Sequence, residues 1–211
     1  MTVDKVALRA VILAGRADLS TVALAVAATA ICHHVVEAVR SAGAARICAY
    51  LPVRTEPGSM PALDELRLGG VEVLLPVLRD DFDLDWARYE GPATLVAARR
   101  GLREPVGRRW GPGAISAVDL AIVPALAVDR TGNRLGRGGG SYDRALARLP
   151  HEVPVIALLH DGEVIAAVPH DDHDRPVTHT VTPAKGCQQI ADHSSATEDV
   201  RAQAADPSTI A

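Results

Sequence analysis

Short runs of apolar residues alternate with longer amphipathic segments along most of the chain, a pattern typical of strands alternating with helices. The short runs predict strands at 46–51, 71–75, 118–123 and 153–159, and weaker ones at 86–89, 94–98 and 164–168. The amphipathic segments predict helices at 4–17, 20–41, 61–68 and 142–149, with Ser20 a suitable N-cap for the second helix. This alternation indicates an α/β fold with a largely parallel sheet, whose ligands collect where strands end.

The apolar content falls sharply near the end of the chain. From Cys187 onward there is no Leu, Phe, Tyr or Trp, and Ala, Ser, Thr, Asp and Gln dominate. Such a segment buries too little apolar surface to order itself. We therefore expect one α/β domain over residues 1–186 and a disordered tail over residues 187–211.

The overall charge excludes some classes of partner. A net charge of −4 and a pI near 6.0 argue against a protein that coats nucleic acid. Charged residues interrupt the first apolar segment, so no signal peptide is expected, and the most apolar helix segment, 22–36, is too short to span a bilayer. Three widely spaced cysteines indicate neither a disulfide framework nor a zinc motif. We expect a soluble cytoplasmic protein.

The most informative segment follows the strand predicted at 118–123. Residues 132–144 read Gly-Asn-Arg-Leu-Gly-Arg-Gly-Gly-Gly-Ser-Tyr-Asp-Arg. Glycines let the backbone approach a ligand closely, and a helix start behind them offers unpaired N–H groups, so the segment predicts a cradle for phosphates. It matches neither common nucleotide-binding glycine motif. The alternative is a flexible hairpin, which Arg134 and Arg137 on either side of the glycines disfavour.

Charged residues elsewhere could complete a site. Lys5 and Arg9 are four residues apart, so a helix places them on one face. Alone they would be read as a solvated basic face, whereas beside the glycine loop they become cations directed at phosphates. Glu56 follows the strand predicted at 46–51 and becomes a binding residue if a substrate offers N–H donors.

A histidine- and aspartate-rich segment near the end could hold a metal. The spacing within residues 170–174 fits no standard zinc or calcium pattern, and a charged surface turn is the simpler interpretation of residues 170–172. Asp174 could instead act with Asp143 as a hard oxygen ligand for Mg²⁺. Common serine-hydrolase, metalloprotease and dithiol motifs are missing, so those chemistries have no support.

At these residues the chain resembles the 5-formyltetrahydrofolate cyclo-ligase (methenyltetrahydrofolate synthetase) family. The resemblance covers roughly residues 4–185. Its motifs are Lys-x-x-Leu-Arg at 5–9 with a further Arg16, Tyr-x-Pro at 50–52 followed by Glu56, Gly-Leu-Arg-Glu-Pro at 101–105, the strand and glycine signature at 123–129 and 134–143, and Pro-x-x-x-His-Asp at 169–174.

The chain departs from the family pattern at a few positions. Ser141 replaces the first of two tyrosines, and Val128 replaces a phenylalanine. Both changes remove aromatic surface from the pocket expected to hold a pteridine. The basic and glycine residues expected to bind phosphates remain.

The resemblance implies ATP-dependent cyclisation of 5-formyltetrahydrofolate to 5,10-methenyltetrahydrofolate, with release of ADP and phosphate. It implies a single-domain three-layer Rossmann-like fold, shared with sugar isomerases and CoA transferases, and a monomer whose partners are the folate and ATP, with no nucleic acid or membrane. Lys5 and Arg137 would be catalytic, Glu56 and Tyr142 would contact the folate, and Asp143 and Asp174 would hold Mg²⁺. The residues implied for ATP are Lys5, Arg9, Arg134, Leu135, Gly136, Arg137, Gly138, Gly139, Gly140, Ser141 and Tyr142.

Two other classes of function remain open at this point. A regulatory or binding protein would retain folate or ATP without turnover, which the pocket substitutions make conceivable. An enzyme acting on phosphorylated sugars or CoA thioesters would share the fold, which is an argument from fold analogy alone. Formation of methenyltetrahydrofolate from 5-formyltetrahydrofolate, ATP and Mg²⁺ separates all three.

Overall fold

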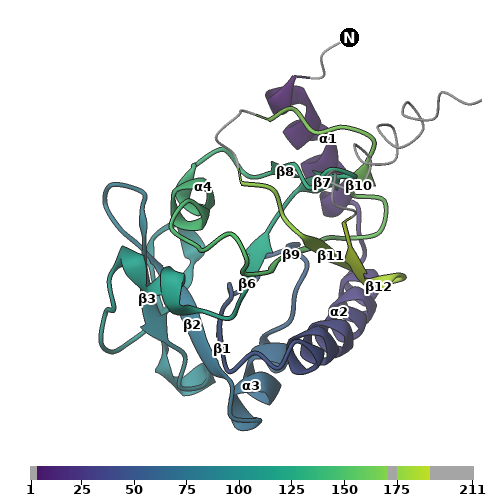
Figure 1. Cartoon of the computed structure of the whole chain (residues 1–211). Coiled ribbons are helices and arrows are strands. Elements are labelled where there is room, and N and C mark those ends of the chain that lie inside the picture. The colour runs from purple at the N-terminus through teal and green to yellow at the C-terminus, as the bar shows by residue number, and fades with distance from the viewer. Residues whose placement is uncertain (1–3, 171–174, 191–211) are drawn as a thin grey trace, which may run out of the picture.

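A seven-stranded sheet forms the centre of the computed structural model, which describes residues 4–170 and 175–190 (Figure 1). Its strand order is β12-β11-β9-β6-β1-β2-β3. The strands are β1 (Arg46–Cys48), β2 (Glu72–Leu78), β3 (Leu84–Arg88), β6 (Leu120–Pro124), β9 (Val155–Leu158), β11 (His179–Thr182) and β12 (Gly186–Gln189). The five inner strands are parallel, and the edge strands β3 and β12 are antiparallel to their neighbours. The predicted α/β class and largely parallel sheet are confirmed.

Helices cover both faces of this sheet. On one face, α2 (Thr21–Ser41) and α3 (Met60–Leu68) pack on alternate strand residues such as Ile47 and Val73. On the other face, α4 (Ser141–Leu146) and the 3₁₀ helix η3 (Pro112–Ala117) pack on the intervening residues, such as Cys48. Because both faces are buried, the inner strands are almost wholly apolar, as the short apolar runs indicated.

The first two helices begin as the sequence predicts. The Asp4 side chain accepts a hydrogen bond of 3.2 Å from Val6 N at the start of α1 (Lys5–Ala17). The Ser20 hydroxyl accepts one of 3.1 Å from Ala23 N at the start of α2. Both side chains satisfy backbone N–H groups that have no partner within the helix, which fixes where each helix starts.

Helix α2 is longer than the apolar segment at 22–36. Its 21 residues are long and apolar enough to cross a membrane by length and composition, so the prediction that it is too short is wrong. Its second half nevertheless packs in the core through Ile31, Val35, Val36 and Val39. The residues of α2 that follow Val36, among them the buried Val39, therefore continue the face of the helix that packs in the core.

Two smaller sheets accompany the central one. β7 (Ala127–Asp129) pairs with β8 (Arg134–Leu135) and with β10 (Val164–Ile165), and β4 (Leu95–Ala97) pairs with β5 (Arg103–Pro105). The short 3₁₀ helices η1 (Pro92–Thr94) and η2 (Arg99–Gly101) flank β4. The strand predicted at 164–168 thus exists only in part and belongs to a small sheet.

Helix α1 packs on the small sheet of β7, β8 and β10, and Figure 1 shows these four elements together at one end of the molecule, away from α3. Leu8, Ile12 and Leu13 of α1 contact a cluster that contains Leu126 and Leu135. The opposite side of α1 is exposed, as Val6 and Val11 show. This packing places the N-terminal helix beside the segment that carries the glycine loop.

The boundary predicted between domain and tail is wrong. β12 pairs with β11 in antiparallel register, with Cys187 opposite Val181, so residues 187–189 belong to the central sheet. An edge strand gains its stability from backbone hydrogen bonds and one packed side chain, which composition does not reveal. Residues 191–211 lie outside the described residues, as do residues 171–174 with Asp174.

A buried carboxylate holds the β7–β8 connection in shape. Asp129, at the end of β7, accepts five hydrogen bonds of 2.7–3.0 Å from Thr131, Asn133 and Val168. Burial alone would raise the pKa of Asp129, but these donors stabilise the anion and lower the pKa below its ordinary value of 3.8. The connection also needs Gly132, because a Cβ there would collide with the carbonyl oxygen of Val177.

We predict that Asp129→Asn lowers the free energy of unfolding by about 2 kcal/mol at pH 7, because an amide nitrogen would then face N–H donors. The native pKa of Asp129 is depressed, so the stability contributed by the carboxylate is present at neutral pH and is lost as the pH falls through its native pKa. The difference between wild type and variant should therefore shrink in acid. Urea unfolding at pH 7 and at successively lower pH measures it.

The matched control is Asp18→Asn, which changes an exposed aspartate after α1. This variant should unfold like the wild type at each pH. Equal stability of Asp129→Asn and wild type at pH 7 would contradict the prediction.

Candidate active site

A cavity of about 510 Å³ lies where the inner strands end. Its wall includes Tyr50 and Leu51, which follow β1, Leu78 at the end of β2, and Pro124 and Ala125, which end and follow β6. The chain runs from β1 outward to β2, and later crosses back to place β6 on the other side of β1. In parallel sheets, such a reversal opens a crevice at the carboxyl ends of the two strands.

A second cavity, of about 410 Å³, opens beside the first. Lys5 and Arg9 of α1 line it together with Arg144. Five residues line both cavities, and they form what we call the shared wall: Arg134, Gly136, Gly138, Gly140 and Asp143. The glycine loop therefore separates a strongly cationic cavity from a larger one with a mostly apolar lining.

All the residues predicted to bind ATP line one cavity or the other. Lys5, Arg9 and Leu135 line only the smaller cavity, and Gly136, Gly138, Gly140 and Arg134 line both. Arg137, Gly139, Ser141 and Tyr142 line only the larger cavity, together with Glu56. The predicted metal ligand Asp143 lies in the shared wall.

Helix α1 is joined to the glycine loop by a direct hydrogen bond. Arg9 Nε donates to Gly136 O at 2.9 Å. Gly138 has a φ of +94°, and a Cβ there would lie 3.4 Å from Arg9 Cζ, so the backbone conformation and the nearby guanidinium both favour glycine. The Arg9 guanidinium therefore packs closely against the backbone of Gly138 in the wall of the smaller cavity.

The helix after the loop is shorter than predicted. α4 begins at Ser141 and ends at Leu146, six residues in place of the helix expected at 142–149. A helix dipole grows with aligned peptide units, so a helix of this length contributes little field. Phosphate binding at this loop would therefore depend mainly on the loop amides and on the neighbouring cations.

Arg134 presents an unsatisfied donor in the shared wall. Its side chain is 5% exposed and forms an ion pair with Asp143. Its Nε atom is buried and has no hydrogen-bond partner among the described residues. A buried guanidinium N–H without an acceptor is costly, and a bound phosphate oxygen would satisfy it.

Asp143 has a second role available. Its side chain is 42% exposed, and one carboxylate oxygen, Oδ1, accepts from Arg134. The other oxygen is available to a hard cation such as Mg²⁺, so the residue predicted as a metal ligand fits that role.

Glu56 and Arg137 meet across the larger cavity. Arg137 Nε lies 2.8 Å from Glu56 Oε1, and the other oxygen of Glu56 accepts from Val53 N at 3.0 Å. The Glu56 side chain is 11% exposed whereas that of Arg137 is 53% exposed. Glu56 is therefore the fixed partner, and Arg137 is the one with room to move.

Two tyrosines form part of the same wall. Burial raises the pKa of Tyr142 well above its ordinary value, and the charge of Glu56 raises it further. The pKa of Tyr50 is raised for the same two reasons, and its hydroxyl donates to Pro57 O. Both phenols are thus neutral at physiological pH, so each hydroxyl keeps a proton that it can donate.

Only one of the two substituted aromatic positions borders the cavity. Ser141 lines the larger cavity, but Val128 is fully buried in the core beneath α4. The prediction that Val128 removes aromatic surface from the pocket is therefore wrong, because β7 turns this side chain toward the core.

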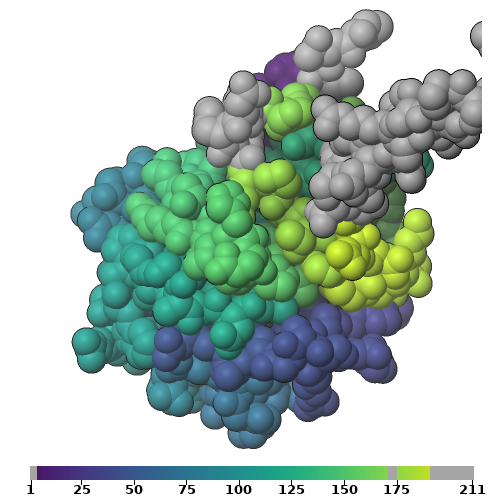
Figure 2. All heavy atoms as spheres, in the orientation of Figure 1, coloured from purple at the N-terminus to yellow at the C-terminus, as the bar shows by residue number. Residues whose placement is uncertain are grey.

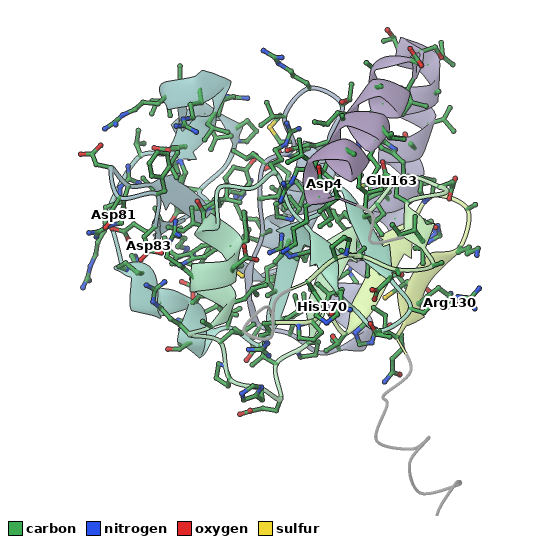
Figure 3. All side chains as sticks on the ribbon, turned by 90° about the horizontal axis from the view of Figure 1, so that it is seen from above. Asp4, Asp81, Asp83, Arg130, Glu163 and His170 are labelled. Carbon is green, nitrogen blue, oxygen red and sulfur yellow. The ribbon has the colours of Figure 1, made fainter. Side chains whose placement is uncertain are left out.

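A buried ion pair that the motif analysis missed supports the site. Arg16, 2% exposed, contacts Glu163 Oε1 at 2.7 Å and donates to Ala125 O at 2.8 Å. Figure 3 shows Glu163 beside the purple N-terminal helices, on the same side as Asp4, whereas Asp81 lies on the opposite side. The signal available in sequence was the spacing of Arg16, two helical turns after Arg9 on one face of α1.

The same ion pair is connected to the segment that carries Glu56. Glu163 Oε2 accepts from His160 N at 2.8 Å, and the ring Nε2 of His160 lies 2.9 Å from Thr55 O. A carbonyl oxygen only accepts, so the His160 ring is the donor. One network therefore joins α1, the turn after β9 and the loop before Glu56.

Arg100, Arg103 and Glu104 also line the larger cavity. Glu104, part of the Gly-Leu-Arg-Glu-Pro motif, accepts a hydrogen bond from Leu78 N at 3.0 Å. This bond holds the β4–β5 hairpin against the end of β2. Nothing in the spacing of the two arginines distinguishes them from solvated surface charges.

Comparison with known proteins gives consistent matches. The model of the 5-formyltetrahydrofolate cyclo-ligase family matches residues 1–183. The chain is 48% identical over 146 residues to the 5-formyltetrahydrofolate cyclo-ligase of Mycolicibacterium smegmatis, covering 66% of this chain and 74% of that protein. It is 31% identical over 142 residues to the Escherichia coli protein of the same name, covering 66% of this chain and 78% of that one.

Solved structures agree in fold. The Aquifex aeolicus 5,10-methenyltetrahydrofolate synthetase has a TM-score of 0.72 and 29% identity, covering 89% of this chain and 93% of that one. The corresponding protein from Mycoplasma pneumoniae has a TM-score of 0.66 and 21% identity, covering 83% of this chain and 96% of that one, and shows similarity of fold alone.

We predict that Glu163→Gln lowers the free energy of unfolding by about 3 kcal/mol, because it leaves the buried Arg16 charge without its counter-ion. Urea unfolding at pH 7 measures the loss. The matched control is Glu65→Gln, which breaks the exposed pair with Arg40 and should cost less than about 1 kcal/mol. Equal losses in the two variants would show that the buried pair has no special role.

Proposed function

The chain belongs to the 5-formyltetrahydrofolate cyclo-ligase family, and from that premise we propose that its two adjoining cavities hold the two substrates, ATP in the smaller and the folate in the larger. The protein is an ATP-dependent enzyme that converts 5-formyltetrahydrofolate to 5,10-methenyltetrahydrofolate with release of ADP and phosphate. The observation that supports assigning one substrate to each cavity is the shared wall. A phosphoryl group must pass directly from ATP to the folate, so the two substrates must lie next to each other.

The charge of the smaller cavity supports its assignment to the triphosphate. Lys5 and Arg9 enter from α1, and Arg134 contributes a buried N–H without an acceptor. The backbone of Gly138 and Gly140 adds amide groups to the wall of this cavity. Such a set of fixed cations and amides suits a polyanion and is organised before it binds.

The larger cavity suits the folate. Its size and mostly apolar lining fit a flat heterocycle, and the rings of Tyr50, which is buried, and Tyr142, which is partly buried, line its wall. Glu56 is a fixed acceptor in this wall, and a pteridine presents amide and amine donors that match a carboxylate.

The reaction then needs little acid–base chemistry from the protein. The formyl oxygen attacks the γ-phosphorus, so an O–P bond forms while the bond to ADP breaks. N10 next attacks the activated formyl carbon, its proton passes to solvent, and the carbon–oxygen bond breaks to release phosphate. The work of the protein is to align the two substrates and to neutralise charge.

Lys5 and Arg137 are the residues we assign to charge neutralisation at the transferred group. Lys5 reaches it from the smaller cavity, and Arg137 from the larger one. When the folate engages Glu56, Arg137 is released from that carboxylate and turns toward the phosphoryl group. Its 53% exposure leaves it free to do so.

When bound, Mg²⁺ supplies positive charge that offsets the negative charge of the phosphates. Asp143 is the residue of the shared wall that would hold it. Asp174, the second ligand implied by resemblance, lies outside the described residues.

Some finer expectations accompany this proposal. The reversal of strand order at the larger cavity supports a Rossmann-like relation to sugar isomerases and CoA transferases. The proposal also includes the expected monomer. A cytoplasmic enzyme that acts on small molecules, without nucleic acid or membrane, is part of this proposal, and the net charge of −4 argues against a nucleic-acid partner.

We predict that turnover, followed as the absorbance of methenyltetrahydrofolate, requires both ATP and Mg²⁺. Arg137→Ala should lower kcat/KM about 100-fold, because the variant loses a charge-assisted contact to the transferred group. The fold should be unaffected because the side chain is half-exposed.

Arg130→Ala is the control, since Arg130 is exposed in the same segment but lines neither cavity. Its kinetics should match the wild type. Equal cyclisation with and without ATP would overturn the division of the two cavities. Unchanged kinetics in Arg137→Ala would remove that residue from the site and leave the rest of the proposal standing.

We predict that Ser141→Tyr lowers the KM for 5-formyltetrahydrofolate about fivefold, which corresponds to roughly 1 kcal/mol of added aromatic contact. The KM for ATP should stay nearly the same, because Ser141 lines only the larger cavity. Steady-state kinetics with each substrate varied in turn give both constants. Ser116→Tyr, at an exposed serine of η3, should change neither. A rise in the folate KM would mean that neighbouring side chains already fill this space.

A further inference from the structure

A group of metal-binding side chains lies outside both cavities, on helix α2. One ligand atom from each of His33, His34 and Glu37 lies within 4.8 Å of the others. His33 and Glu37 are exposed and His34 is half-buried. Figure 2 shows the yellow C-terminal strands lying against the blue-violet band of α2 on this face, and the helix contacts both β11 and β12.

The helix itself brings the three side chains together. Glu37 is four residues after His33 and three after His34, spacings that place side chains next to each other on a helix. The two imidazole rings lie with centroids 5.7 Å apart and planes inclined by 27°. An ion bound here needs no change of backbone, only small rotations of side chains in contact with solvent.

His34 is held in an orientation suited to a ligand. Its Nε2 lies 3.3 Å from Pro183 O, which can only accept, so Nε2 carries the proton and Nδ1 carries the lone pair. Metal-binding histidines commonly donate their other ring N–H to a backbone carbonyl in this way. A Cβ at Gly186 would lie 3.2 Å from Nδ1, so the glycine is what lets the His34 ring pack this closely against the β11–β12 hairpin.

The electrostatics of the group favour a cation. Within the described ranges, the ion pairs do not include Glu37, although Asp64 and Glu65 of the neighbouring helix α3 have arginine partners. After burial, the charge of Glu37 is the next cause that raises the pKa of the neighbouring Cys187 thiol. The Glu37 carboxylate thus lies near two imidazoles and a thiol, and it forms no ion pair among the described residues.

We propose that His33, His34 and Glu37 form a binding site for a divalent transition-metal ion of the Zn²⁺ type, with water completing the coordination. Imidazole nitrogens select such ions over Mg²⁺, which prefers oxygen ligands, so this site does not compete for the ion at Asp143. Because the ion binds the folded state, it stabilises the packing of α2 against the β11–β12 hairpin.

The test uses the full chain freed of metal by a chelator and titrated with ZnCl₂ in a calorimeter. We expect one equivalent to bind and the melting temperature to rise. His33→Asn and Glu37→Gln should each weaken binding at least tenfold and reduce the rise. Turnover without added Zn²⁺ should be unchanged in both variants, since neither residue lines a cavity.

Two controls identify where the ion binds. His151→Asn changes an exposed histidine after α4 and should leave Zn²⁺ binding intact. His170→Asn tests the histidine-rich segment that begins at residue 170, another place in the sequence with closely spaced potential ligands. Zn²⁺ affinity that survives in His33→Asn and Glu37→Gln, or that is lost only in His170→Asn, overturns the proposal. Absence of binding to the wild type also overturns it.

Discussion

The arrangement of the candidate active site depends on the buried ion pair between Arg16 and Glu163. Helix α1 covers neither face of the central sheet, and its apolar contact is a narrow one through Leu8, Ile12 and Leu13. The Arg16 guanidinium fixes the far end of this helix to Glu163 and to the end of β6. A buried pair of this kind contributes more to orientation than to net stability, because desolvation offsets much of its attraction. Its value here is that it sets the direction in which Lys5 and Arg9 point.

Glu163 also positions the opposite side of the site. Its second oxygen orients the turn that carries His160, and the His160 ring holds the carbonyl of Thr55. Glu56 follows immediately and meets Arg137 of the glycine loop. A single carboxylate thus supports a side chain we assign to the folate and a helix we assign to ATP. The two halves of the site are aligned through the interior of the protein and not only through the loop between them.

Local features of the sequence predicted much of this structure. The N-cap at Ser20 could be predicted because capping depends on neighbouring residues alone. Lys5, Arg9 and Arg134 could be assigned to one site because helical periodicity places the first two on one face, and Arg134 follows a strand that ends at the ligand-binding edge of the sheet. β12 was missed because its stability comes from pairing with a distant strand. Nothing in the sequence around Glu163 distinguishes it from an acidic residue of an exposed turn, because its partner Arg16 is distant in the chain. The inward direction of the Val128 side chain is set by the register of a small sheet, which hydrophobic periodicity does not reveal.

The shared wall has an evolutionary consequence. Gly136, Gly138 and Gly140 border both cavities, so a change at any of them alters the surroundings of two ligands at once. Such positions are pleiotropic, because a substitution that improves the contact with one ligand also changes the contact with the other. Ser141 borders the larger cavity alone, so a substitution there changes the surroundings of the ligand we assign to that cavity and leaves the smaller cavity as it is. Selection can therefore act on Ser141 through one ligand at a time.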